Sequence, residues 1–443
     1  MIKTGIYCIL LALCRFSLYS QEPTASDLKI QEAFTAHMTD FAQNVDTDKL
    51  KAKLKEKGPE GFCWVEFRYL NGMLTSYELT RDTKYLDLFR DSFAVFQGLM
   101  EKGPDGYLGW YGPTLPDRKP KDNPALEVDE IQTNFRAVGI LARWVELAKQ
   151  DEDYATENAE TIKQYLTLME EQLFPKWDAR EHFREIPGKG GVYRWLDYPI
   201  QEGVSLSFEK LSIMVNGLLA LYRVTENPVY MQRALQVGAW YKSNLILKDG
   251  HYEWMSWVPA GEWDIHPEKE DAWRVGWMAP DPNAAWYVSS VSIAVNLYRH
   301  GLLFDDEDLA RFIKTQKEMC WNGDMENPEY RSVSGETSKW IKGRFLSPEL
   351  ANFDPVIHQL AFQGPHEAQQ LANAASSWKG GVGAEGYIQE KYLNPDTAQP
   401  FIGFGKKYLE DEASKTFYDQ INQPVEEDTV VIPRTPAVWS AQQ

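Results

Sequence analysis

Apolar and polar residues recur along most of this chain with helical spacing, and the predicted helices come in pairs. The periodicity predicts paired helices over residues 62–79 and 84–100, 130–149 and 158–173, 207–224 and 228–247, 283–300 and 306–319, and 348–362 and 366–377. One or two further helices are predicted between residues 28 and 55. Strand patterns are scarce, and the clearest lies at 250–254. The sequence therefore predicts an all-α protein.

The two helices of each pair differ in polarity. The first is rich in alanine, valine, leucine and aromatic residues, and the second is more charged. Helices that are apolar all round are buried, whereas helices with one polar face lie outside. Inner helices that alternate with outer ones describe an α/α toroid, complete or incomplete, over residues 21–380. Long loops precede the inner helices, so we expect them to meet over a central cleft.

The two ends of the chain differ from this helical body. Lys3 and the short apolar run at 6–13 are typical of a signal peptide, residues 1–20, with cleavage after Ser20. Neither this run nor any later stretch is long enough to span a bilayer, so a secreted or periplasmic protein is predicted. Residues 381–443 are less regular. We expect them to form an extension that packs on the toroid, with a partly disordered tail.

The cysteines and the net charge limit which partners and which kind of binding site the chain can have. After cleavage Cys63 and Cys320 remain, and they could form one disulfide. We favour two buried thiols because a core of this size needs no disulfide. The net charge of −19 excludes nucleic acid as a natural partner. It would also repel an anionic polysaccharide at long range, so a site for uronate needs its own basic cluster. The 16 tryptophans and 22 tyrosines suit stacking on sugar rings as well as burial.

Polar and aromatic residues gather in the loops and at the starts of the predicted inner helices. The chain has no HExxH, P-loop, GxSxG or dinucleotide-binding pattern, so neither a metal nor a cofactor is predicted. Arginine suits a uronate carboxylate because its planar fork can bond both oxygens. The residues expected to bind substrate are Trp110, Gln132, His182, Arg184, Glu209, Trp254, Trp277 and Arg344.

In this layout, and in the residue types of these loops, the chain resembles the α/α-toroid polysaccharide lyases that act on uronic-acid polymers, the alginate and glucuronan lyases. The resemblance covers about residues 60–380. It implies β-elimination without a metal: the uronate carboxylate is neutralised, a base removes the C5 proton, and an acid protonates the departing oxygen. The implied catalytic residues are the neutralisers Asn134, Arg194 and Arg274, the base His251 or His358, and the acid or shared acid/base Tyr193, Tyr198 or Tyr287.

One departure from the family leaves the base open. Some of these lyases have an adjacent Asn-His pair, but here Asn134 is followed by Phe135. We also expect turnover to depend much more on Arg194 and Arg274 than on Arg136.

Two alternatives remain. A glycoside hydrolase on the same toroid needs two carboxyl groups across the scissile bond. It could draw them from Asp129, Glu130, Glu209, Glu253 and Asp264. A non-catalytic glycan-binding protein is the other alternative. The partner expected in each case is a polysaccharide, anionic for the lyase, and the sequence predicts no particular oligomeric state.

Overall fold

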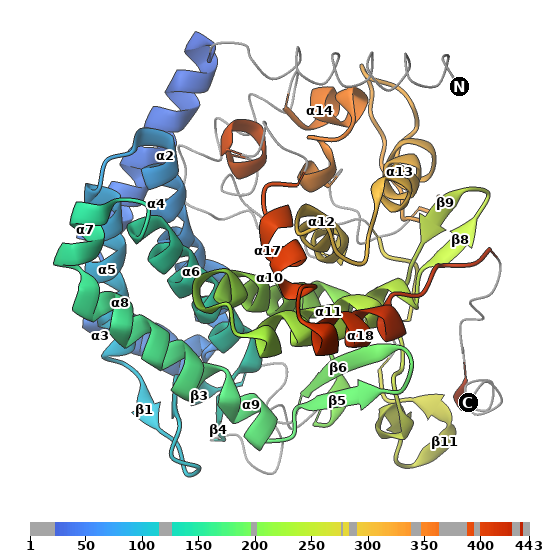
Figure 1. Ribbon diagram of the computed structural model, residues 1–443, viewed down its shortest axis with the longest axis horizontal. Coiled ribbons are helices and arrows are strands. Elements are labelled where there is room, and N and C mark those ends of the chain that lie inside the picture. The colour runs from blue at the N-terminus through green and yellow to red at the C-terminus, as the bar shows by residue number, and fades with distance from the viewer. Residues whose placement is uncertain are drawn as a thin grey trace.

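The computed structural model describes residues 23–114, 126–195, 202–275, 278–282, 290–337, 347–362, 388–393, 399–427 and 435–436. This part of the chain is mostly helical, with several small antiparallel sheets at its periphery (Figure 1). No helix within it is long and apolar enough to cross a membrane.

The helices follow one another along the chain with few interruptions. Their bounds are α2 Ala25–Gln43, α3 Thr47–Lys57, α4 Phe67–Thr80, α5 Lys84–Gln97, α6 Ile131–Ala148, α7 Glu152–Glu157, α8 Ala159–Thr167, α9 Pro175–Ala179, α10 Phe208–Thr225, α11 Pro228–Lys242, α12 Val291–Arg299, α13 Asp306–Lys314, α14 Pro355–Phe362, α17 Ile402–Tyr408 and α18 Glu412–Ile421. Short π-helical segments extend the pattern at Phe62–Glu66, Leu168–Leu173, Thr315–Met319 and Gln389–Leu393.

The strands are all short. Their bounds are β1 Glu101–Lys102, β2 Leu108–Gly109, β3 Tyr111–Pro113, β4 Glu127–Asp129, β5 Phe183–Ile186, β6 Gly190–Trp195, β7 Val204–Ser205, β8 Ile246–Lys248, β9 His251–Glu253, β10 Ile265–His266 and β11 Lys269–Trp273. They pair antiparallel as β1–β2, β3–β4, β5–β6–β7, β8–β9 and β10–β11. The sheet β5–β6–β7 packs against α11, and its three strands were not predicted from the sequence.

The predicted helix pairs are largely confirmed where the structure describes them. The main difference is the end of α11, which stops at Lys242 instead of reaching residue 247. Residues 246–248 form strand β8 instead, and Asp249 and Gly250, both with positive φ, form the two-residue loop of the β8–β9 hairpin. An Asp-Gly loop of this kind favours a hairpin over a continued helix. The predicted helix at 366–377 and residues 283–289 lie outside the described residues.

The polarity of the helices sorts them into two rows (Figure 1). Most residues of α4, α6 and α10 are buried, whereas α5 and α13 bury a single face. In the first row α4 contacts α6, α6 contacts α10, and α10 contacts α12. In the second row α5 packs against α4, α8 against α6, α11 against α10, and α13 against α12. The first helices of the pairs therefore lie in one row and the second helices in another, although most residues of α11 in the second row are buried as well. Among the described residues, the cysteines Cys63 and Cys320 are buried free thiols, as predicted.

The closest contact of the inner row lies between α6 and α10. Gly139 and Gly217 face each other there, and a Cβ added to Gly217 would meet the backbone oxygen of Phe135 at 2.7 Å. Without side chains at these two positions the helix backbones can approach closely. The approach fixes the spacing of the inner row at its centre.

The segment at 399–421 packs at the far end of the inner row. The ring of Phe401 stacks on His300 with 4.9 Å between centroids, and α18 contacts α11. A Cβ on Gly405 would meet the backbone oxygen of His300 at 1.9 Å, so α17 lies directly against the end of α12. This C-terminal region contains two regular helices that the sequence pattern did not predict.

The glycine contact generates a first prediction. Gly217→Ala should destabilise the protein by about 1–3 kcal/mol, because the added methyl group must push α6 and α10 apart. Gly403→Ala is the matched control, since a Cβ there meets nothing within 4 Å. Urea unfolding of both variants measures the difference. Equal midpoints would show that the two helices are not held by this contact.

Candidate functional site

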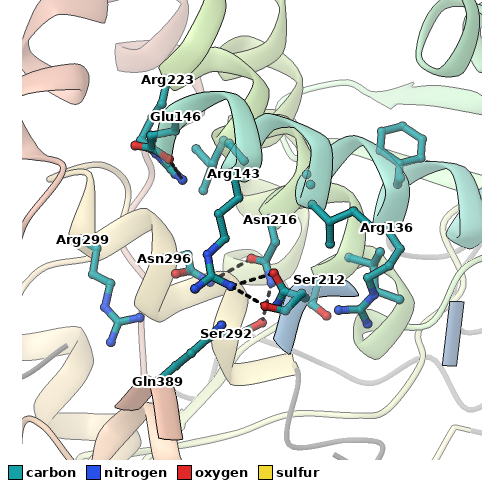
Figure 2. Close-up of a pocket in the computed structure, with 18 of the residues that line it drawn as sticks. Arg136, Arg143, Glu146, Ser212, Asn216, Arg223, Ser292, Asn296, Arg299 and Gln389 are labelled. Carbon is teal, nitrogen blue, oxygen red and sulfur yellow. Dashed lines mark hydrogen bonds and ion pairs between the residues drawn. The ribbon is translucent and has the colours of Figure 1, made fainter. Parts of the chain in front are cut away.

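The inner row encloses a polar cavity. It has a volume of about 410 Å³ and lies between α4, α6, α10 and α12 (Figure 2). Its polar wall residues repeat along each helix mostly at intervals of three, four or seven positions, the spacing that places side chains on one face. They are Arg68, Asn71 and Glu78 on α4, Arg136, Arg143 and Glu146 on α6, Glu209, Ser212, Asn216 and Arg223 on α10, and Ser292, Asn296 and Arg299 on α12. Four largely apolar helices thus each turn a polar stripe toward one space.

Charged side chains of both signs line this wall, and its glutamates are Glu78, Glu146, Glu209, Glu349 and Glu390. Five arginines line the cavity: Arg68, Arg136, Arg143, Arg223 and Arg299. The chain as a whole carries a net charge of −19. Because arginines and glutamates are equally numerous in the wall, it favours an anionic ligand only where a guanidinium has no carboxylate beside it. Whether the cavity meets the requirement for local basic residues therefore depends on the partners of each arginine.

Three of these arginines are neutralised by glutamates. Arg223 binds Glu146 through Nε and Nη2, each at 2.9 Å. Arg299 binds Glu390 through Nη1 at 3.2 Å and Nη2 at 2.7 Å. Each guanidinium thus uses two nitrogens on one carboxylate, the strongest geometry for such a pair.

The third pair joins α6 to α4. Arg143 pairs with Glu78 and also donates to Oδ1 of Asn71 at 2.7 Å. The charge of a guanidinium paired in this way is balanced within the protein, so the group attracts an anionic ligand only weakly.

Arg136 differs from these three. Within the described residues it has no carboxylate at ion-pair distance, and its buried Nε has no hydrogen-bond partner. Its neighbour is the thiol of Cys63, whose pKa is raised to about 12 by burial, so that the thiol stays neutral. Figure 2 shows Arg136 at one end of the labelled residues and Arg299 at the other. Arg136 therefore keeps a positive charge that a bound anion could neutralise.

Amide and hydroxyl groups occupy the middle of the cavity. Asn296 donates to Oδ1 of Asn216 at 2.8 Å, and Asn216 donates to Oγ of Ser292 at 3.5 Å. Among the described residues, the second hydrogen on each amide nitrogen and Oδ1 of Asn296 form no bond. An asparagine amide can make up to four hydrogen bonds. This part of the wall can therefore still donate to and accept from the hydroxyl groups of a ligand.

One carboxyl group of the wall has a raised pKa. The pKa of Glu349 is raised to about 7, first by burial and then by the charge of Glu390, although Ser347 donates to it at 2.6 Å. A carboxylic acid that keeps its proton near neutral pH can donate a hydrogen bond or a proton.

A second polar network lies at the N-terminal ends of α6 and α10. Lys210 lies between the indole rings of Trp64 and Trp195, 5.5 and 5.0 Å from their centroids, and donates to Oε1 of Gln132 at 3.1 Å. Gln132 in turn donates to Glu130 at 2.6 Å. Burial, and after it the charge of Glu60, raises the pKa of Glu130 to about 7. Gln132 and Glu130 are almost fully buried, so this network joins α6 to α10 and has no room for a ligand.

Most of the predicted site residues lie elsewhere. Trp110 and Trp254 are buried and donate to the backbone oxygen of Phe96 and to Asp281, at 2.7 and 2.9 Å. Their hydrogen bonds and burial are those of core residues, not of exposed sugar platforms.

Three predicted polar residues are also buried outside the cavity. Asn134 donates to Asp129 at 2.8 Å, and Nδ1 of His182 bonds the backbone oxygen of Arg194 at 2.7 Å. The hydroxyl of Tyr193 accepts from Arg233 at 3.3 Å, and burial raises its pKa further above the ordinary value of 10. A phenol held in this way is poorly suited to proton transfer at neutral pH.

The predicted basic loops do form a cluster, but outside the cavity. Arg194 lies over the ring of Trp263 at 5.1 Å, and Arg274 donates to the backbone oxygen of the same residue at 3.3 Å. Arg184 pairs with Glu181 at 3.0 Å. The structure thus brings Arg194 and Arg274 together beside the three-stranded sheet. It places Arg136, which was expected to matter less, in the cavity wall.

The two histidines proposed as base also lie outside the cavity wall. Nε2 of His251 is 3.4 Å from Glu253 on β9. His358 lies on α14 against the ring of Phe362, and burial lowers its pKa. The remaining candidates Tyr198, Trp277, Tyr287 and Arg344 lie outside the described residues.

Of the carboxylates considered for a hydrolase, Glu209 lines the cavity. Asp129 is bound by Lys176 at 2.6 Å and by Arg180 at 2.9 Å. Asp264 accepts hydrogen bonds from Ser205 and from the backbone of Ala260, and burial raises its pKa to about 6. Among the described residues, no group of three or more histidine, cysteine, aspartate or glutamate side chains could hold a metal ion.

A comparison with known families finds no match, and a comparison with curated proteins finds no significant match either. The sequence signal for the cavity was the spacing of polar residues on helices that are otherwise apolar. Arg136 and Arg143, seven positions apart, share one helix face with Glu146. The function has to be argued from this wall.

The raised pKa of Glu349 generates a second prediction. Between its ordinary value of 4.5 and about 7, the folded state keeps a proton that the unfolded state loses. Stability from this group should therefore fall as pH rises through that window. Glu349→Gln has no proton to lose, so it should be more stable than the parent at pH 8 by about 1–3 kcal/mol, and close to it at pH 4.

Urea unfolding at the two pH values measures this difference. Glu307→Gln is the control, because Glu307 pairs with Arg311 on the outer helix α13 and is mostly exposed. A pH-independent difference between Glu349→Gln and the parent would contradict the raised pKa.

Proposed function

We propose that this chain is an exported polysaccharide lyase that cleaves a uronate-containing glycan in the cavity between α4, α6, α10 and α12. The observation that carries the proposal is Arg136, a cavity arginine without a carboxylate partner among the described residues. We interpret the two rows of helices as an incomplete α/α toroid, with the cavity on its axis. The signal-like residues 1–20, with Lys3 before the apolar run at 6–13, support export.

The proposed chemistry starts at the carboxylate. The guanidinium of Arg136 can donate two hydrogen bonds to a uronate and so stabilise the charge that develops when the C5 proton leaves. A base takes that proton, a double bond forms between C4 and C5, the C4–O bond breaks, and an acid protonates the departing oxygen. Tyr198 and Tyr287, which lie outside the described residues, remain our candidates for the acid or the shared acid/base.

A glycoside hydrolase is the second candidate, and Glu349 is the observation that favours it. Hydrolysis needs one carboxyl group that is protonated and one that is ionised. Glu349 lines the cavity with its pKa raised to about 7, and Glu209 lies in the same wall. Binding of a glycan without cleavage is the remaining alternative.

A panel of acidic and neutral glycans separates the three activities. A lyase product carries a C4–C5 double bond and absorbs near-ultraviolet light without added reagents. It should form even when a metal chelator is present. A hydrolase instead yields reducing ends with no such absorbance. A binding protein yields neither signal but retards the polymer in a gel. We expect absorbance to rise on a uronate polymer, and a flat trace across all uronate polymers would remove the lyase proposal.

The cavity arginine generates a third prediction. Arg136→Met should lower kcat/KM on the best uronate polymer by about 100-fold, because the developing charge loses its main donor. Arg331→Met removes the same charge outside the cavity wall and should stay within about threefold of the parent. A larger loss in Arg274→Met than in Arg136→Met would move the site to the cluster at Trp263.

A further inference from the structure

The charges of the cavity are divided unequally between its two ends. At one end Arg136 has no carboxylate partner among the described residues. At the other end Arg223 and Arg299 are each bound through two nitrogens to a glutamate. Figure 2 shows these ends apart, with Asn216, Ser292, Asn296 and also Arg143, which pairs with Glu78, between them. The wall thus changes from an arginine without a described carboxylate partner, through amide and hydroxyl groups and the Arg143–Glu78 pair, to the two ion pairs of Arg223 and Arg299.

The far end is unsuited to a second carboxylate. To bind one, Arg223 would have to release Glu146, or Arg299 would have to release Glu390. The released glutamate would remain in the cavity wall without its partner, next to the incoming anion. Leaving a charge unpaired in a partly buried site costs more than a new pair of the same kind returns. A ligand with a carboxylate on every ring would therefore meet repulsion at this end.

The middle of the cavity suits hydroxyl groups. Asn216 and Asn296 keep amide hydrogens that no described residue uses, and Oδ1 of Asn296 can accept a further bond. Sugar hydroxyls both donate and accept, so they match groups of this kind better than a carboxylate, which only accepts. The volume of about 410 Å³ falls in the range of sites that enclose a small ligand.

We infer that this cavity selects a glycan in which each uronate is linked to a neutral sugar. The uronate carboxylate binds Arg136, and the neutral unit lies against Asn216 and Asn296, short of the Arg223–Glu146 and Arg299–Glu390 pairs. The inference rests on the proposed function and specifies its substrate class. It disfavours polymers that carry a carboxylate on every unit.

Two tetrasaccharides of equal length test this inference on the full mature chain. One alternates glucuronate with N-acetylglucosamine, and the other contains glucuronate alone. Calorimetric titration gives Kd for each, and we expect the alternating compound to bind at least about tenfold more tightly. The same preference should appear in kcat/KM if the compounds are cleaved.

The variant Glu146→Gln tests whether the Arg223–Glu146 pair causes the difference in Kd between the two tetrasaccharides. It frees the charge of Arg223, so the glucuronate tetrasaccharide should bind about tenfold more tightly than it binds the parent, and the alternating one should change by less than about threefold. Glu390→Gln frees Arg299 and serves as a second variant if the first has a lowered melting temperature. Glu307→Gln, on the outer helix α13, removes the same charge and should change neither Kd.

The outcomes separate the two proposals. If the glucuronate tetrasaccharide binds the parent as tightly as the alternating one, the inference is overturned while the proposed function stands. If neither compound binds or is cleaved, the proposed function itself fails, and the inference with it. A tenfold preference that Glu146→Gln or Glu390→Gln narrows supports the inference.

Discussion

Placing arginines between four apolar helices imposes one constraint on this fold: a guanidinium removed from water needs a carboxylate or a ligand to offset its desolvation. Three cavity arginines meet this requirement within the protein, through Glu78, Glu146 and Glu390. These pairs also join α4 to α6, α6 to α10, and α12 to the segment at 388–393. Arg136, by contrast, has no carboxylate partner among the described residues. The ion pairs that hold the inner row together thus leave the charge of Arg136 for binding.

The close packing of the inner helices and the polar cavity depend on each other. Gly139 and Gly217 let α6 and α10 approach, so the long side chains that follow along the same faces reach across one narrow space. A wider crossing would separate Arg223 from Glu146 and admit water between them, which weakens an ion pair. Backbone geometry at two glycines therefore sets the electrostatics at the far end of the cavity.

Periodicity predicted the helices well because burial of an apolar face is a local property of the sequence. It was wrong where a turn sequence ends the regular pattern, as at Asp249–Gly250 in the β8–β9 hairpin, and it did not predict most of the short strands. The site was harder to predict, because the sequence does not show which polar residues share a space. Loop composition favoured Arg194 and Arg274, whereas the cavity is lined by helix residues such as Arg136 and Arg143. The prediction that tryptophans stack on sugar rings was wrong for Trp110 and Trp254, which fill the core together with Trp257. Composition alone does not distinguish a buried tryptophan from one exposed on a loop.

The pairing of charges across the cavity also constrains how such a protein can diverge. Replacing Glu146 alone leaves Arg223 without its counter-charge, and replacing Arg223 alone leaves the glutamate. Two coupled residues of this kind change together more easily than one at a time, because each single replacement is worse than either end state. A lineage that acquired a different ligand at this end would be expected to exchange both members of a pair, and the two positions would vary together among its descendants.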